Sequence, residues 1–260
     1  MTTTIDAQTW RWWTLLRAAS VLNVGLLVLT WWGAQLDTPV ARAQAVCATI
    51  YTLVCGFRSF WPRVDLERTV LVDHPLSGIA LGRSSATVAE MAFTVQCALF
   101  VAGLAETSGQ PWMSAVAWFV VPLIAVAQTC CWLGVLTLRH AWHAAEEALW
   151  AVMMALFAAV FVAAFPSADP LHQVALAIGL VGCLAGGWVM AVLDIPMYLR
   201  RQRAENEAGT RFLSVGAGFA DAVSRRAPTG SWDVWRHEVA WMTPYFTAGV
   251  WLSLALVWLG

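Results

Sequence analysis

Apolar runs of about 20 residues recur along the whole chain, and this feature restricts the possible fold more than any other. Each run is long enough to cross the hydrocarbon core of a bilayer as a helix. Only 12% of the 260 residues are charged, whereas soluble domains carry about 25%. The strict alternation of a membrane β-barrel is absent. The sequence therefore predicts an all-α, polytopic membrane protein.

Seven such runs are separated by polar or proline-containing turns, which predicts a seven-transmembrane-helix bundle. We expect one transmembrane domain over residues 1–260, because no internal repeat and no second domain is evident. The predicted spans are approximately 12–33, 43–61, 84–104, 113–138, 140–165, 171–199 and 239–259. Two longer connectors, 62–83 and 200–236, lie on the same side of the membrane in this arrangement.

The distribution of arginine predicts which side of the membrane holds the N-terminus and the two long connectors. Of the 15 basic residues, all of them arginine, only Arg42 falls on the side opposite to the N-terminus and the two long connectors. Positive residues concentrate in cytoplasmic loops. We therefore expect a cytoplasmic N-terminus, an outside C-terminus and a location in the membrane, with the abundance of Arg and Ala favouring a bacterial inner membrane.

The two connectors have local patterns of their own. The segment 64–71 has the polarity of a short amphipathic helix, which Asp73-His74-Pro75 would end. In the second connector, Phe212, Val215, Phe219 and Val223 form an apolar stripe at helical spacing. That stripe predicts a helix lying on the membrane surface, with a mobile loop as the alternative.

The most informative polar stretch is 139–150, at the start of the fifth span. At helical spacing His140, His143 and Glu147 share one face, and Glu146 lies beside them. A charged carboxylate at the end of a membrane span costs free energy, because it loses solvation. Such residues usually face the interior of the helix bundle and have a function there. The alternative is a solvated helix end with both glutamates outside the bilayer.

Five spans place ionisable groups at a similar depth below the predicted cytoplasmic boundary. Counting from the nearest boundary arginine at about 1.5 Å per residue gives depths of roughly 7–12 Å. These groups are Glu90, Glu146, Glu147, Asp194, Arg17 and Arg58, edged by His140, His143 and Tyr198, with Gln96 and Gln128 deeper. Four acids share this layer with two guanidiniums, which leaves an excess of negative charge. Protonated carboxylates, charged histidines or a bound cation must neutralise that excess. A purely structural network, with Arg17 paired to Glu90 and Arg58 to Asp194, is the alternative.

A divalent transition metal is one way to balance the acid excess, with His140, His143 and Glu147 as the candidate ligands. Their spacing permits metal binding but matches no established zinc motif. Haem is not expected, since no two histidines lie at mid-membrane depth on facing spans. The absence of lysine excludes a retinal Schiff base. The six cysteines form no CxxC pair and are interpreted as small packing residues.

The favoured hypothesis is an integral-membrane enzyme acting on a lipid or isoprenoid-like amphiphile by acid–base or metal-assisted chemistry. The predicted partners are therefore membrane lipid and a hydrophobic or amphiphilic small molecule, and the net charge of −1 suggests no nucleic acid. The candidate catalytic residues are Glu146, Glu147, Glu90, Asp194 and His143. The candidate substrate-binding residues are Arg17, Arg58, Tyr198 and Gln128.

Two other functions remain open. Ionisable groups within spans, together with Pro122, Pro196 and Pro244 as possible kinks, also fit a proton-coupled transporter or channel. A non-catalytic subunit or assembly factor of a membrane complex is the other alternative. The 17 tryptophans do not separate these possibilities, because many lie near span ends as in an ordinary aromatic belt.

Overall fold

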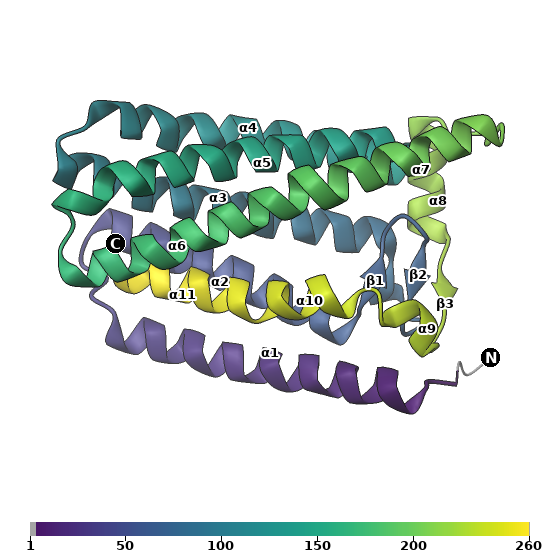
Figure 1. Cartoon of the computed structure of the whole chain (residues 1–260). Coiled ribbons are helices and arrows are strands. Elements are labelled where there is room, and N and C mark those ends of the chain that lie inside the picture. Colours follow the sequence, from purple (N-terminus) through teal and green to yellow (C-terminus); the bar gives the residue numbers. More distant parts are fainter. Residues whose placement is uncertain (1–3, 260) are drawn as a thin grey trace. The chain divides into compact units, whose positions relative to one another are not determined.

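The protein is almost entirely helical, as Figure 1 shows. The structure is a computed structural model, and it describes residues 4–259. Within that range seven helical segments are long and apolar enough to cross a membrane. They are Ala7–Gly33, Pro39–Phe60, Ile79–Ser108, Pro111–Thr137, His140–Ser167, Pro170–Glu207 and Val239–Leu259. The predicted number and order of apolar helices are confirmed, and several helices extend further than predicted.

The first five segments are α1 (Ala7–Gly33), α2 (Pro39–Phe60), α3 (Ile79–Ser108), α4 (Pro111–Thr137) and α5 (His140–Ala164), extended by the 3-10 turn η2 (Phe165–Ser167). The sixth segment consists of α6 (Pro170–Trp188), the π-helix η3 (Val189–Asp194) and α7 (Ile195–Glu207). The seventh consists of α10 (Val239–Phe246) and α11 (Ala248–Leu259).

Proline and a capping side chain set the start of several helices. Pro39 occupies the first position of α2, and the Thr38 hydroxyl accepts a hydrogen bond from Ala41 N. Pro170 opens α6, and the Asp169 carboxylate accepts hydrogen bonds from the first free backbone N–H groups. A proline at this position loses no helical hydrogen bond, because the first N–H groups have no partner within the helix.

The helices form two compact units, residues 1–96 with 219–260 and residues 97–218. The boundaries fall inside α3 and inside the short helix α8 (Val215–Ser224). We describe each unit by itself.

In the first unit, α1, α2, α10 and α11 pack around an apolar core. Its largest fully buried side chain is that of Trp235, from the short helix α9 (Trp232–Trp235). Polar side chains also join helices here. Gln96 donates to Ser253 O at 2.6 Å, and the Ser253 hydroxyl donates back to Gln96 Oε1 at 2.6 Å. Such bonds satisfy polar groups that would otherwise face hydrocarbon.

The predicted amphipathic helix at 64–71 is wrong. Strands β1 (Arg63–Val64) and β2 (Thr69–Val70) pair antiparallel there, and β2 pairs in parallel with β3 (Ala227–Pro228). Arg68 reverses the chain with φ +56°, and its buried guanidinium donates to Asp221 Oδ2 at 2.8 Å. Strand β2 forms in place of a helix because it pairs with Ala227–Pro228, 158 residues further along the chain (227 − 69), and a local apolar pattern carries no information on that partner.

In the second unit, α4 and α5 run side by side and α5 also packs on α6 and α7 (Figure 1). One face of α6 is uncovered over its whole length. Its exposed stripe consists of Leu171, Val174, Ile178, Val181 and Leu184, each at least 59% exposed. A continuous apolar stripe of this kind is expected where a helix faces lipid.

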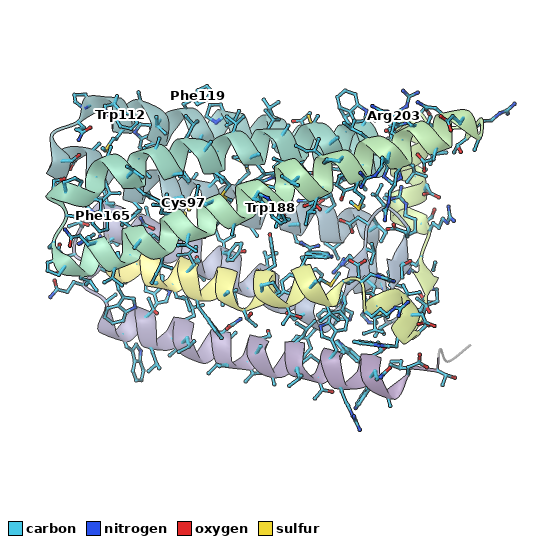
Figure 2. The ribbon with its side chains drawn as sticks, viewed as in Figure 1. Cys97, Trp112, Phe119, Phe165, Trp188 and Arg203 are labelled. Carbon is cyan, nitrogen blue, oxygen red and sulfur yellow. The ribbon has the colours of Figure 1, made fainter. Side chains whose placement is uncertain are left out.

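Figure 2 shows how polar and aromatic residues are distributed along this unit, with Arg203 near the end of α7 and Trp112 and Phe165 at the opposite helix ends. Trp188 lies between them, where α6 passes into η3. Aromatic residues near the ends of the spans, and arginines concentrated at one of the two sides, are typical of helices that cross a bilayer.

In the second connector, the apolar residues Val215, Phe219 and Val223 lie within α8, so the predicted helix is confirmed over that part. All three are about half exposed. Phe212 precedes the helix and lies under the guanidinium of Arg139, whose central carbon is 4.8 Å from the ring centroid. The exposed apolar side of α8 is what a helix on a membrane surface requires.

Candidate functional site

The central feature of the second unit is a buried histidine–glutamate pair on the first two turns of α5. His143 Nδ1 lies 2.9 Å from Glu146 Oε2. The three-residue spacing on one helix places the two side chains on the same face. Both residues are less than 9% exposed. An Nδ1–H that donates to an ionised carboxylate forms a charge-assisted hydrogen bond, which is stronger than a neutral one.

The His143 ring is held from two sides. The ring of Tyr198, on α7, stacks on it with centroids 5.3 Å apart. Gly134, on α4, faces the Nε2 end of the ring, and a Cβ at position 134 would lie 2.5 Å from Nε2. Nε2 has no hydrogen-bond partner among the described residues. The nitrogen engaged with another polar group is therefore Nδ1.

Cys131, on α4, completes this group. The ligand atoms of Cys131, His143 and Glu146 all lie within 4.8 Å of one another, and all three residues are buried. The sequence analysis interpreted Cys131 as a packing residue. One feature of the sequence indicates that Cys131 lies near Glu146. The helices α4 and α5 form a helical hairpin with a turn near Leu138, so residues about equally far from the turn face each other. Cys131 lies seven residues before that turn and Glu146 eight residues after it.

His140 and Glu147 do not belong to this three-residue group. His140 Nε2 lies 3.2 Å from Glu205 Oε1, a carboxylate on α7 that the sequence analysis did not consider. The His140 ring also stacks on Tyr198, with centroids 6.0 Å apart. Two histidines on one helix thus share a tyrosine and contact two different carboxylates.

The other predicted site residues of this unit lie on α4, α5 and η3, and their side chains differ in burial. Gln128 is buried on α4, whereas Glu147 on α5 and Asp194 at the end of η3 are half-buried. π-Helical segments are rare and often occur at functional positions. Asp194 is therefore an acid placed on an irregular part of a membrane span.

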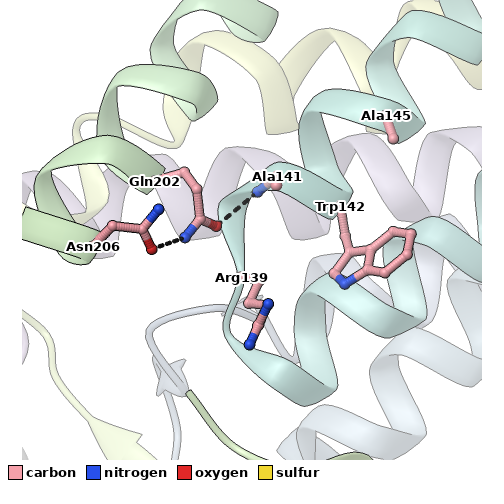
Figure 3. A pocket seen from close by; sticks show the side chains of 6 residues that line it. All are labelled: Arg139, Ala141, Trp142, Ala145, Gln202 and Asn206. Atoms are coloured by element: carbon pink, nitrogen blue, oxygen red, sulfur yellow. Dashed lines mark hydrogen bonds between the residues drawn. The ribbon is translucent and has the colours of Figure 1, made fainter. Parts of the chain in front are cut away.

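A surface recess of about 350 Å³ opens beside the first turns of α5 (Figure 3). Gln202 Oε1 accepts a hydrogen bond from Ala141 N at 3.0 Å, and Gln202 Nε2 donates to Asn206 Oδ1 at 3.0 Å. The recess is lined by Arg139, Ala141, Trp142, Ala145, Gln202 and Asn206. It combines a cation, amide groups, an indole and the positive end of a helix dipole.

The polar centre of the first unit is organised around Glu90 on α3. Arg83 donates to Glu90 Oε2 at 2.7 Å, and the Tyr245 hydroxyl donates to Glu90 Oε1 at 3.0 Å. The sequence predicts Glu90 as a site residue, but it identifies neither Arg83 nor Tyr245 as a partner of the carboxylate. Arg83 is seven residues away on the same helix, which puts the two side chains on one face.

Arg17 does not form the alternative ion pair with Glu90. Its guanidinium lies 4.0 Å from the Trp13 ring centroid and 5.0 Å from that of Trp10. It donates to the Thr14 hydroxyl at 3.1 Å. The half-buried Arg17 side chain is thus held in a cation–π arrangement by two tryptophans of its own helix.

Arg58 is the unusual cation of the first unit. It is only 6% exposed, and its guanidinium lies 5.6 Å from the Phe246 ring centroid. No ion pair and no hydrogen bond of Arg58 occurs within residues 4–259. Burial, helped by the positive charge of Arg58 and opposed by Asp65, lowers the pKa of nearby Arg63 to about 10. The first unit therefore buries positive charge that its own carboxylates do not neutralise.

Comparison with protein-family models, with curated proteins and with solved structures found no match. The function is therefore argued from the side chains of this chain alone. Two polar centres are available, one acidic and rich in histidine, the other rich in arginine.

Proposed function

We propose that the chain is an integral-membrane enzyme that acts on a lipid or isoprenoid-like amphiphile, with His143 and Glu146 at its reaction centre. The observation that carries this proposal is the 2.9 Å contact between two buried ionisable side chains near the start of a long, mainly apolar helix. A buried carboxylate and imidazole are costly for stability and are typical of sites where protons are transferred.

The pair is suited to acid–base chemistry. A carboxylate that accepts a hydrogen bond from an imidazole N–H is held in its ionised form, and it can act as the general base that takes a proton from a substrate and returns it in a later step. Tyr198 stacks on the ring and limits its rotation. The same side chains, together with Cys131, are also able to bind a metal ion, so metal-assisted chemistry is the second route at this centre.

The substrate class follows from the surroundings of the pair. The helices are apolar on their outer faces, so the hydrophobic chain of an amphiphile can lie against them within the bilayer at low cost. The recess beside Arg139 offers a cation and amide donors for an anionic or polar head group. Arg58 and Arg17 remain predicted head-group contacts, and Gln128, Glu90, Glu147 and Asp194 remain predicted site residues.

The proposed setting is a bacterial inner membrane, with the N-terminus in the cytoplasm. The arginine distribution supports this orientation, because Arg42 is the sole arginine on the other side of the predicted topology. In this orientation the first turns of α5 and the recess lie at the cytoplasmic face.

Lipid analysis of expressing cells tests the proposed activity. Membranes from cells that produce the wild-type protein are compared by untargeted mass spectrometry with membranes containing Glu146→Gln at equal abundance. We expect at least one lipid or isoprenoid species to change in amount with the wild-type protein and to remain at the vector level with the variant. Glu106→Gln, an exposed carboxylate at the far end of α3, serves as the matched control and is expected to behave as wild type.

The proposal is wrong if no species differs between wild-type and vector membranes, or if Glu146→Gln reproduces every wild-type change. Both variants are checked for monodisperse elution in detergent, so that loss of folding is not read as loss of activity. His143→Gln provides a second variant of the same pair.

Proton-coupled transport is the second candidate function, and one observation favours it. Asp194 ends the π-helix η3 within a membrane span, two residues before Pro196. Irregular backbone at an intramembrane acid is common in transporters. Proteoliposomes loaded with a pH-sensitive dye test this alternative: proton flux with the wild-type protein that is lost in Asp194→Asn supports transport, and no flux rejects it.

A further inference from the structure

We propose that Cys131, His143 and Glu146 form a binding site for a divalent transition metal, with zinc as the best match. The metal would be held between α4 and α5 by one sulfur, one nitrogen and one carboxylate oxygen. This inference goes beyond the proposed enzymatic function, because such a site exists or fails to exist whatever the substrate is.

The distances support the site. In tetrahedral zinc sites the metal–ligand bonds of about 2.0–2.3 Å place neighbouring ligand atoms roughly 3.3–3.7 Å apart. The three ligand atoms here lie within 4.8 Å of one another, and Nδ1 and Oε2 are 2.9 Å apart. The separations between the three ligand atoms are therefore of the size that a bound zinc ion requires.

The donor set selects the metal. Thiolate and imidazole ligands favour zinc and its neighbours over magnesium and calcium, which prefer oxygen alone. Three protein ligands leave the fourth tetrahedral position open, as in catalytic zinc sites. The open position would be available to water or to a polar group of the substrate.

Charge balance also favours a dication. A thiolate and a carboxylate carry two negative charges, and a divalent metal neutralises both. A buried thiol otherwise keeps its proton, so a bound dication is what would stabilise the thiolate beside the carboxylate. The proton at His143 Nδ1 and the thiol proton leave when the metal binds, so metal affinity should rise with pH.

The scaffold positions the imidazole in advance. Gly134 leaves room for the ring on α4, and Tyr198 stacks on its face. With Nε2 directed at Gly134, Nδ1 is the nitrogen on the side of Glu146. A fixed ring orientation lowers the entropy cost of binding the metal.

Metal analysis of the purified full-length protein tests the site. The protein is purified in detergent without chelators, incubated with zinc, freed of unbound metal and measured by mass spectrometry of the elements. We expect about one zinc per chain. Cys131→Ser should lower zinc affinity by more than about 100-fold, beyond the usual effect of losing a supporting contact. Cys130→Ser is the matched control, because it removes the neighbouring buried thiol and leaves the three ligands intact.

Cobalt substitution gives a readout that does not depend on activity. Cobalt bound by a thiolate has a sulfur-to-metal charge-transfer band, which should be present in wild type and Cys130→Ser and absent in Cys131→Ser. If Cys131→Ser does not fold, Glu146→Gln replaces it in the stoichiometry measurement. Monodisperse wild-type protein that binds less than about 0.1 zinc per chain overturns the proposal, as does equal zinc loss in Cys130→Ser and Cys131→Ser.

Failure of the metal site is distinguishable from failure of the enzymatic function. Bound zinc with an unchanged lipid profile would reject the enzyme and keep the site. A lipid change that depends on Glu146 in zinc-free protein would reject the site and leave acid–base chemistry as the mechanism.

Discussion

The imidazole of His143 occupies the space that Gly134 leaves open on the neighbouring helix. A Cβ at position 134 would lie 2.5 Å from Nε2, 2.7 Å from Cδ2 and 3.0 Å from Cε1 of that ring. The absence of a side chain on α4 is thus what allows a buried histidine on α5 to approach. The contact fixes the ring against the helix and directs Nδ1 to Glu146.

This contact predicts the effect of Gly134→Ala. The new methyl group must displace the His143 ring, so we expect a loss of about 1–3 kcal/mol in the free energy of unfolding, as for other overpacked cores. Thermal unfolding in detergent measures it. Gly182→Ala is the matched control, since a Cβ there meets no atom within 4 Å. It should be neutral or stabilising by up to about 1 kcal/mol. Equal effects of the two variants would contradict the contact.

Two of the buried arginines, Arg58 and Arg68, should respond differently to replacement by methionine. Arg68→Met removes the nearer cation of Asp221, 2.8 Å away, and leaves Arg225 at 3.8 Å from a carboxylate whose side chain is 21% exposed. Breaking a fully buried pair costs about 3–5 kcal/mol. Because Asp221 is partly solvated, we expect about 2–4 kcal/mol here.

Arg58→Met removes a buried cation that has no carboxylate partner in the described chain. The variant is expected to leave the unfolding temperature unchanged or to raise it, because desolvation of the guanidinium is no longer required. The measurement is thermal unfolding of both variants in the same detergent. A loss of stability with Arg58→Met as large as that with Arg68→Met would mean that Arg58 has a structural role.

Asp169 should make stability depend on acid pH. Hydrogen bonds from the backbone and the ring of His172 hold the pKa of the Asp169 carboxyl below its ordinary value of 3.8. A carboxyl with a lowered folded-state pKa stabilises the fold fully above the unfolded pKa, and this stabilisation is lost as the pH falls through the folded pKa.

The comparison is between wild type and Asp169→Asn, because asparagine keeps a helix-capping side chain and removes the charge. The wild type should unfold at the higher temperature near about pH 6, and the difference should vanish near about pH 2. A difference that stays constant over this range would show that the charge of Asp169 does not stabilise the helix start.

The proposed orientation predicts the location of the C-terminus. A reporter that is active only outside the cytoplasm, fused after the last span, should be active. The same reporter placed in the connector around 208–212 should be inactive. The opposite pattern would reverse the membrane orientation and place the first turns of α5 at the outer face.

Much of the helical architecture was accessible from local patterns. Runs of apolar residues indicated all seven helical segments, and prolines with capping residues such as Thr38 and Asp169 marked where helices begin. The segment 64–71 was predicted incorrectly, because its strands depend on pairing with residues 227–228. A local pattern carries no information on such a distant partner.

The candidate sites show the same division. His143 and Glu146 were identifiable because they are one helical turn apart in the sequence. Gly134 and Tyr245 were not, since each contributes through a different helix from the residue it contacts, and Cys131 was indicated only by its distance from the turn between α4 and α5.

The sequence by itself determined that this protein is a set of long apolar helices with ionisable side chains near one end. Apolar length and helical periodicity are properties of neighbouring residues, so they can be counted along the chain. The tertiary structure alone decided which side chains meet. It brought Cys131 to His143 and Glu146, gave Glu90 to Arg83 and Tyr245, and left Arg58 without a carboxylate. These contacts depend on the angle and distance at which neighbouring helices pack. The side chains along the whole contact between two helices set that angle and distance together.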